Sequence, residues 1–139
     1  MSRSASSGRE RGSAIVEFIG VGVLLGVPLF YLLIALAGLH SAALAATTMA
    51  QQLAAVQANS PDAAAAEERV GVARAEMARS AGVDPAAVRV QIECDRPCPG
   101  PGARVRVDVQ ISVSLPLLPS TGGVASVESS ATVLSPRYG

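Results

Sequence analysis

The N-terminal part of the chain is dominated by one apolar stretch. No Asp, Glu, Lys or Arg occurs between Glu17 and Asp62. Within that interval the residues from Phe18 to Leu39 read FIGVGVLLGVPLFYLLIALAGL, which matches the ~20 apolar residues that a helix needs to cross the hydrocarbon core of a membrane. The pattern therefore predicts a transmembrane helix.

Helix-forming residues continue beyond this stretch. Four larger apolar residues are spread among alanines between Ser41 and Ala58, namely Leu44, Met49, Leu53 and Val56. This composition predicts that the membrane helix extends outward as a stalk. The sequence Asn59-Ser60-Pro61-Asp62 then interrupts it, because Ser60 is a favoured N-cap and proline is favoured at the first helical position.

A second helix is predicted from this cap to about Ala81, where Gly82 ends it. Its apolar residues recur at helical spacing, at Val70, Ala73 and Met77. Charged residues of both signs occupy the remaining positions, so we expect a solvated face over a narrow apolar stripe.

The periodicity changes from helical to alternating after Pro85. Valine, isoleucine and cysteine alternate with polar residues from Val88 to Cys94, and again from Arg104 to Leu115. A weaker alternation runs from about Val124 to Leu134, with one apolar face formed by Ala125, Val127, Ala131 and Val133. Alternation of this kind predicts half-buried strands. The expected fold class is therefore α+β, with a small antiparallel sheet packed on the second helix.

Composition and charge narrow the possible functions. Half of the residues are hydrophobic but only 3% are aromatic, the formal net charge is zero, and every basic residue is arginine. The absence of a lysine-rich tail argues against binding to nucleic acid. Ahead of the apolar stretch, Arg3, Arg9 and Arg11 outnumber Glu10, which favours a cytoplasmic N-terminus and an external C-terminal part.

A secretory signal peptide is the alternative interpretation of the same N-terminal pattern. The segment Ala35-Leu36-Ala37 offers a small-x-small cleavage site. However, the apolar run is longer than the usual signal core of about 7 to 15 residues, and Glu17 lies at its start. An ionised acid near the bilayer costs a few kcal/mol unless it is paired or lies at the interface.

The segment Arg11-Gly12-Ser13-Ala14-Ile15-Val16-Glu17-Phe18 resembles the processing site of type IV prepilins. In that family a short basic leader ends in glycine, and the fifth residue of the mature chain is glutamate, commonly followed by an aromatic residue. The resemblance implies cleavage between Gly12 and Ser13, with Glu17 and Phe18 acting in subunit assembly.

Two roles are open for Glu17. It would pair with the freed amine of a neighbouring subunit, a Coulomb attraction of roughly 1 to 4 kcal/mol at contact distance. Alternatively, it merely stabilises a helix N-terminus through the helix dipole, worth less than about 1 kcal/mol when exposed.

The order of elements is similar to that of TadE-like minor pseudopilins of the tight-adherence (Flp) pilus system. This resemblance implies residues 1–12 as a leader, 13–58 as a transmembrane and stalk helix, and 59–139 as an exported α+β domain. It also implies a single-pass protein of the bacterial cell membrane that contributes to assembly of a pilus or related secretion apparatus. The implied partners are a prepilin peptidase, other pilin-like subunits, pilus assembly proteins and membrane lipid.

Other residues suggest more limited roles. Gly22 and Gly26 have the spacing that lets two membrane helices approach closely, although glycine is also simply frequent in such helices. Cys94 and Cys98 are expected to form a disulfide if the domain is exported. Two thiols and the distant His40 do not make a metal site, so we expect no cofactor.

Three classes of function can be compared on these features. A structural pilin-like subunit is favoured. A membrane-anchored or secreted domain that binds another envelope protein is the alternative, and would use the helix only as an anchor. An enzyme is disfavoured, because no serine, histidine or acid occurs in a recognised catalytic spacing.

Overall fold

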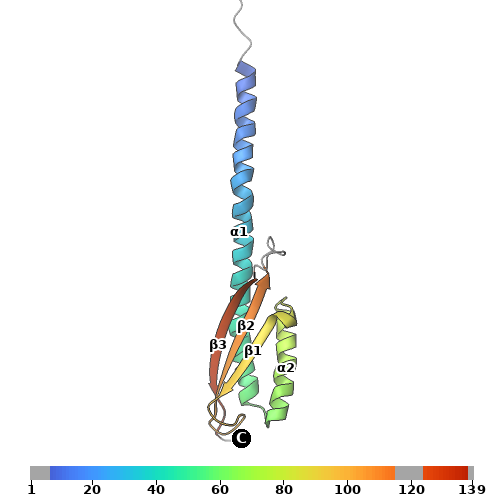
Figure 1. Ribbon diagram of the computed structural model, residues 1–139, viewed down its shortest axis with the longest axis vertical. Coiled ribbons are helices and arrows are strands. Elements are labelled where there is room, and N and C mark those ends of the chain that lie inside the picture. The colour runs from blue at the N-terminus through green and yellow to red at the C-terminus, as the bar shows by residue number, and fades with distance from the viewer. Residues whose placement is uncertain (1–6, 115–123, 138–139) are drawn as a thin grey trace, which may run out of the picture. The chain divides into compact units, whose positions relative to one another are not determined.

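A computed structural model describes residues 7–114 and 124–137 of the chain. Its elements are α1 (Ser7–Ala58), α2 (Ala63–Ser80), a single 3₁₀ turn (Pro85–Ala87), β1 (Val88–Cys94), β2 (Arg104–Ser114) and β3 (Val124–Leu134) (Figure 1). The chain divides into two compact units, Met1–Ala37 and Gly38–Gly139. The α+β fold class is confirmed.

The helix α1 is 52 residues long and includes both the apolar stretch and the predicted stalk. An apolar span long enough to cross a membrane lies within it, and none of that span is buried inside the protein. The helix continues through Pro28. The prediction of one helix running on to Ala58 is confirmed.

The three strands form one antiparallel sheet in the order β1-β2-β3. The first and third strands have the predicted bounds, and β2 ends at Ser114. Leu115, which was expected to continue β2, lies outside the described residues. The sheet pairs Val88 with Ile111 at one end of β1 and Cys94 with Val105 at the other.

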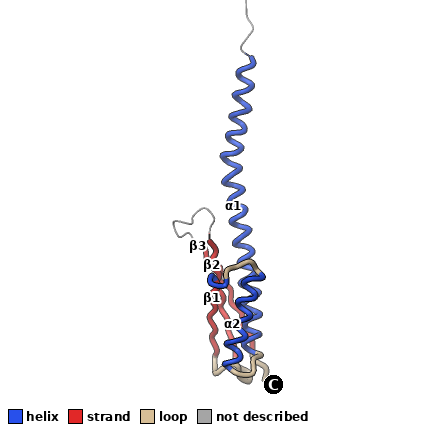
Figure 2. Tube along the Cα trace, turned by 90° about the vertical axis from the view of Figure 1, so that its right-hand side faces the viewer, coloured by secondary structure: helices blue, strands red, loops and turns tan. Residues whose placement is uncertain are grey.

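The two faces of β2 differ in polarity. Valines and isoleucine of β2 point to one face and are fully buried there, at Val105, Val107, Val109 and Ile111. The polar residues that alternate with them, such as Arg106, are exposed or half-buried. Figure 2 shows α2 and the adjoining part of α1 on one side of the strands, so the second unit has two layers.

The core of the second unit depends on α1 more than the sequence indicated. Met49 and Leu53 are among the largest fully buried side chains. They belong to one cluster with the inward-facing valines of the sheet. Alanines at every fourth position complete this buried face of α1, at Ala42, Ala46, Ala50, Ala54 and Ala58. The segment described as a stalk therefore supplies a wall of the core.

The start of α2 differs from the prediction. Its N-cap is Asp62, whose carboxylate accepts a 2.8 Å hydrogen bond from the Ala65 backbone N–H. Ser60 was expected to cap this helix, but its hydroxyl donates instead to the Val56 carbonyl at the end of α1. The aspartate takes over the cap because it follows two residues later, in extended conformation.

The end of α2 and its apolar stripe follow the prediction. Gly82 has a φ of +69°, the left-handed conformation that ends many helices. Val70 is buried, while Ala73 and Met77 are half-buried against the core. Ala66 and Ala78 are also fully buried on this helix.

Candidate functional site

The predicted processing segment lies within the first unit, in the early turns of α1. The Gly12–Ser13 bond is part of the helix in this structure. Glu17 is exposed, and Phe18 next to it is 80% exposed. A protease that reads this bond in an extended conformation would have to unwind the end of the helix first.

A shallow apolar groove runs along one face of the apolar stretch. Gly22 and Gly26 form its floor, while Phe18, Phe30 and Tyr31 are among the larger residues that line it. Its volume is about 590 Å³. A Cβ atom added at either glycine would meet nothing within 4 Å. The groove is thus open to a neighbouring helix, and it contains Phe18 of the predicted assembly residues together with both glycines.

Gly20 and Glu17 do not line this groove. Gly20 lies two positions before Gly22, and successive helical residues turn by about 100°. Two residues therefore differ by about 200°, which places Gly20 on the opposite side of the helix from Gly22.

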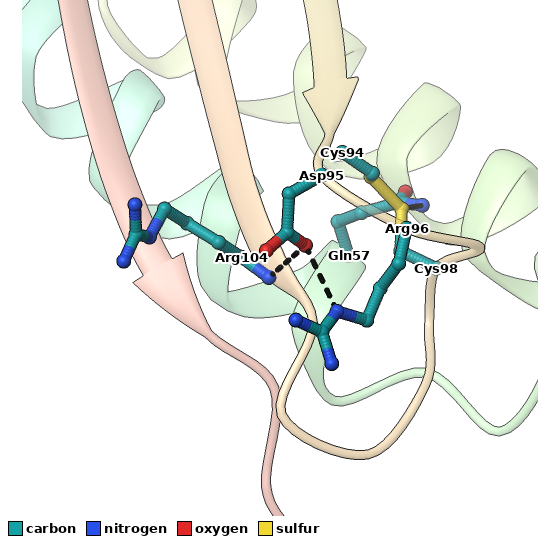
Figure 3. The surroundings of a disulfide bond; sticks show 6 residues. All are labelled: Gln57, Cys94, Asp95, Arg96, Cys98 and Arg104. Carbon is teal, nitrogen blue, oxygen red and sulfur yellow. Dashed lines mark hydrogen bonds and ion pairs between the residues drawn. A yellow bond between two sulfur atoms is a disulfide. The ribbon is translucent and has the colours of Figure 1, made fainter.

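The predicted cysteine pair lies in the second unit, at the end of β1. Cys94 and Cys98 form a disulfide with a Cα–Cα distance of 6.2 Å (Figure 3). Gln57 of α1 is 8% exposed and its amide donates to Cys98 Sγ over 3.7 Å. The disulfide closes the loop after β1, and the Gln57 hydrogen bond joins that loop to the helical wall of the core.

Asp95 closes the same loop against β2. Its carboxylate accepts a 2.8 Å hydrogen bond from the Arg104 backbone N–H. It also pairs with Arg96 Nε at 3.5 Å (Figure 3). The hydrogen bond from the Arg104 N–H is the main reason that the pKa of Asp95 is lowered below its ordinary value, and Arg96 lowers it further. Both interactions favour the charged carboxylate.

The outer face of the sheet carries a second charged contact. Arg106 donates from Nε to both carboxylate oxygens of Asp108, at 3.2 and 3.1 Å. This contact raises the pKa of Arg106, with smaller contributions from Glu93 and Glu128 across the strands. The ion pair is solvent-exposed, so its contribution to stability is small.

One groove of the second unit is lined by both apolar and charged residues, among them Glu68, Arg69 and Glu76. It measures about 790 Å³ and lies between α1 and α2, with a lining that contains no Ser, Cys or His. In residues 7–114 and 124–137, no three His, Cys, Asp or Glu side chains gather closely enough to hold a metal ion. His40 is exposed.

The predicted site residues thus form separate features. Gly12 to Gly26 belong to the first unit, and the disulfide belongs to the second. Sequence reasoning missed Gln57 and Asp95, because their partners lie 41 and 9 positions away, at distances that only the folded chain reveals.

No family model matches this chain, and no match was found among curated proteins or solved structures.

Proposed function

We propose that this chain is a membrane-anchored, TadE-like minor pseudopilin that is cut after Gly12 and contributes to assembly of a tight-adherence (Flp-type) pilus or a related secretion apparatus. The observation that carries the proposal is an apolar helical span, exposed all round, that begins directly after one acid residue, Glu17. The residues before that acid supply the expected basic leader and glycine.

The exposed apolar surface of α1 demands an apolar environment. Its large side chains are 50–80% exposed at Ile15, Val16, Phe18, Ile19, Val21, Val23, Leu24, Leu25, Val27, Leu29, Phe30, Leu32, Leu33, Ile34 and Leu36. Burying such side chains is worth roughly 1.5–3 kcal/mol each, so covering the set is worth on the order of 20 kcal/mol. This exceeds the ~5–15 kcal/mol by which typical domains are stable. Lipid and neighbouring apolar helices are the partners that fit.

The charge pattern and the disulfide support one orientation. The arginine-rich leader favours the cytoplasm, whereas a disulfide persists in oxidising compartments outside it. The second unit, which contains the Cys94–Cys98 bond, is accordingly assigned to the extracytoplasmic side.

Cleavage after Gly12 would give Glu17 a partner. It would create an amine at Ser13, at the new start of α1. The amine of one subunit and the Glu17 carboxylate of another would attract each other by roughly 1 to 4 kcal/mol, depending on the local dielectric. Such pairing offsets the cost of holding an acid at the membrane border. The shallow apolar groove at Gly22 and Gly26 would let a neighbouring helix approach closely.

Processing is tested by N-terminal sequencing and intact mass. The protein is purified from membranes of cells that contain a prepilin peptidase. A chain that begins Ser13-Ala14-Ile15 supports the proposal. A chain that begins at Gly38 would instead identify a secreted domain released by signal peptidase, and an uncut chain would leave a simple membrane anchor.

The role of Glu17 is tested by Glu17→Ala. We expect membrane insertion and processing to be retained and pilus assembly to be lost, because the carboxylate that pairs with the neighbouring amine is gone. Glu68→Ala, at an exposed glutamate of α2, is the matched control and should assemble normally. Normal pilus formation by Glu17→Ala would refute the assembly role of this carboxylate.

A further inference from the structure

The strand β1 has a free edge whose hydrogen-bonding groups can be identified. The Asp95 N–H donates to the Arg104 carbonyl just beyond the β1–β2 ladder. Because hydrogen-bonded and non-bonded pairs alternate in an antiparallel ladder, residues 89, 91 and 93 bond to β2. The N–H and C=O groups of Val90 and Ile92 therefore point away from the sheet. Within the described residues, nothing bonds to them.

The strand β3 has a free edge of the same kind. The Ser135 N–H donates to the Ala103 carbonyl, which fixes the odd-numbered residues of β3 as those that bond to β2. The backbone groups of Glu128, Ser130 and Thr132 consequently point outward. In this 11-residue strand, Glu128 is the one charged residue, and there is no lysine or proline of the kind that protects edge strands from pairing.

The edge of β1 opens onto a groove beside α2. The groove measures about 610 Å³, and its lining includes Gly71, Val90 and Ile92. Ile92 faces inward but is 37% exposed. Gly71 leaves open space where a Cβ would meet nothing within 4 Å. At the start of β1, Arg74 donates over 3.4 Å to the Val88 carbonyl. An additional strand beside β1 would cover the exposed part of Ile92 and lie over α2.

The two edges are complementary in charge when compared row by row across the sheet. On the outer face, one row runs Glu128–Gln110–Arg89 from β3 to β1. The next rows run Ser130–Asp108–Gln91 and Thr132–Arg106–Glu93. Each row has a different residue type at each end. A second copy placed sideways without stagger would put its Glu128 beside Arg89, and no two like charges would meet.

From these observations we infer that this chain associates with further copies of itself edge to edge, the β1 strand of one copy pairing in parallel with the β3 strand of the next. In this register Val90 lies beside Ser129 of the neighbouring copy. The outward groups of Val90 and Ile92 then reach those of Glu128, Ser130 and Thr132 in that copy. This contact uses two different surfaces, so each copy can bind one neighbour at β1 and another at β3, and the contact repeats beyond a dimer into a ring or an open row of subunits.

Parallel pairing fits the arrangement of the elements. β1 and β3 run in the same direction, because each is antiparallel to β2. Two β1 edges related by a two-fold axis would bring two α2 helices together on one face, since α2 lies at the β1 side of the unit (Figure 1). A two-fold axis between two β3 edges would make the segment 38–58 of one copy run opposite to the same segment of the other copy. In the proposed function, on which this inference rests, all copies are inserted in one membrane with the same topology. Their strands therefore run in the same direction, as parallel pairing requires.

The pairing is tested by zero-length cross-linking of the full chain in lipid vesicles. The chain contains no lysine, so Arg89→Lys supplies its sole side-chain amine. A carbodiimide joins an amine to a carboxylate that touches it, with loss of water. We expect a ladder of covalent dimers and higher multiples, with an amide bond between the side chains of position 89 and Glu128 of another copy. Adding Glu128→Gln should reduce the ladder to the background of the unsubstituted chain.

Arg69→Lys is the matched control, because Arg69 is exposed on α2 and belongs to neither edge. It should give no ladder. Absence of a ladder with Arg89→Lys would overturn the inference, as would a product that stops at the dimer with a link to Glu93. N-terminal sequencing of the same sample separates the two proposals. A chain starting at Ser13 without a ladder refutes only the edge pairing, and an uncut chain with a ladder refutes only the processed pilin-like subunit.

Discussion

The packing of α1 against the sheet can be tested at Leu53. This side chain is fully buried in the cluster that includes the inward valines of β2. Truncation by Leu53→Ala removes buried methyl groups and leaves a cavity, which costs about 2–5 kcal/mol in typical cores. A change of 1 kcal/mol shifts the melting temperature of a small domain by about 4–8 °C, so about 3 kcal/mol corresponds to a decrease of roughly 12–24 °C.

Trypsin resistance of the full chain in detergent gives a direct assay. Trypsin cuts after arginine, and Arg104 and Arg106 lie within β2, so cleavage there reports unfolding of the sheet. The measured quantity is the temperature at which half of the chain is cut in β2. Leu44→Ala is the matched control, since Leu44 lies on the same helix but is 58% exposed. If the two variants melt within a few degrees of each other, the segment 38–58 does not support the sheet.

Two further predictions concern local contacts of the second unit. Asp62→Ala should lower the free energy of unfolding by about 1 kcal/mol, because it removes the N-cap of α2. Asp62→Asn keeps a side-chain oxygen that can cap the helix and should retain most of that stability in the same thermal assay. Equal losses in the two variants would contradict the capping role of Asp62. The lowered pKa of Asp95 means that its charged form stabilises the fold at pH values above its unfolded pKa near 3.8, and that this contribution is lost as pH falls from that value through the lower folded pKa. Asp95→Asn should therefore weaken the decline of the melting temperature between pH 4 and pH 2, and an unchanged decline would contradict the role of the Arg104 N–H.

The strands could be predicted closely from the sequence. From Arg104 to Ser114, charged or polar residues alternate with valine and isoleucine at every position, and a period of two is unambiguous for a strand with one buried face. The alternating pattern of β3 was weaker, because serine and alanine differ less in polarity than arginine and valine do. Its bounds and its inward face are nevertheless as predicted. The apolar span of α1 was equally clear, since charge is absent from it.

The buried face of α1 was not predicted because alanine hides it. Alanines from Ala42 to Ala58 recur at every fourth position, but other alanines lie between them, so no apolar stripe stands out against a polar background. The fourfold spacing was nevertheless a usable signal, since small residues so arranged let another layer approach closely. The contacts of Asp95 and Gln57 had no comparable signal.

Residues 38–58 belong both to the helix of the anchor and to the core of the second unit. A soluble fragment for crystallography or for raising antibodies should therefore begin near Gly38. A fragment that begins at Asn59, where the sequence places its domain boundary, would lack Met49 and Leu53. It would also leave the valine-lined face of the sheet in water, and we expect such a fragment to precipitate instead of folding.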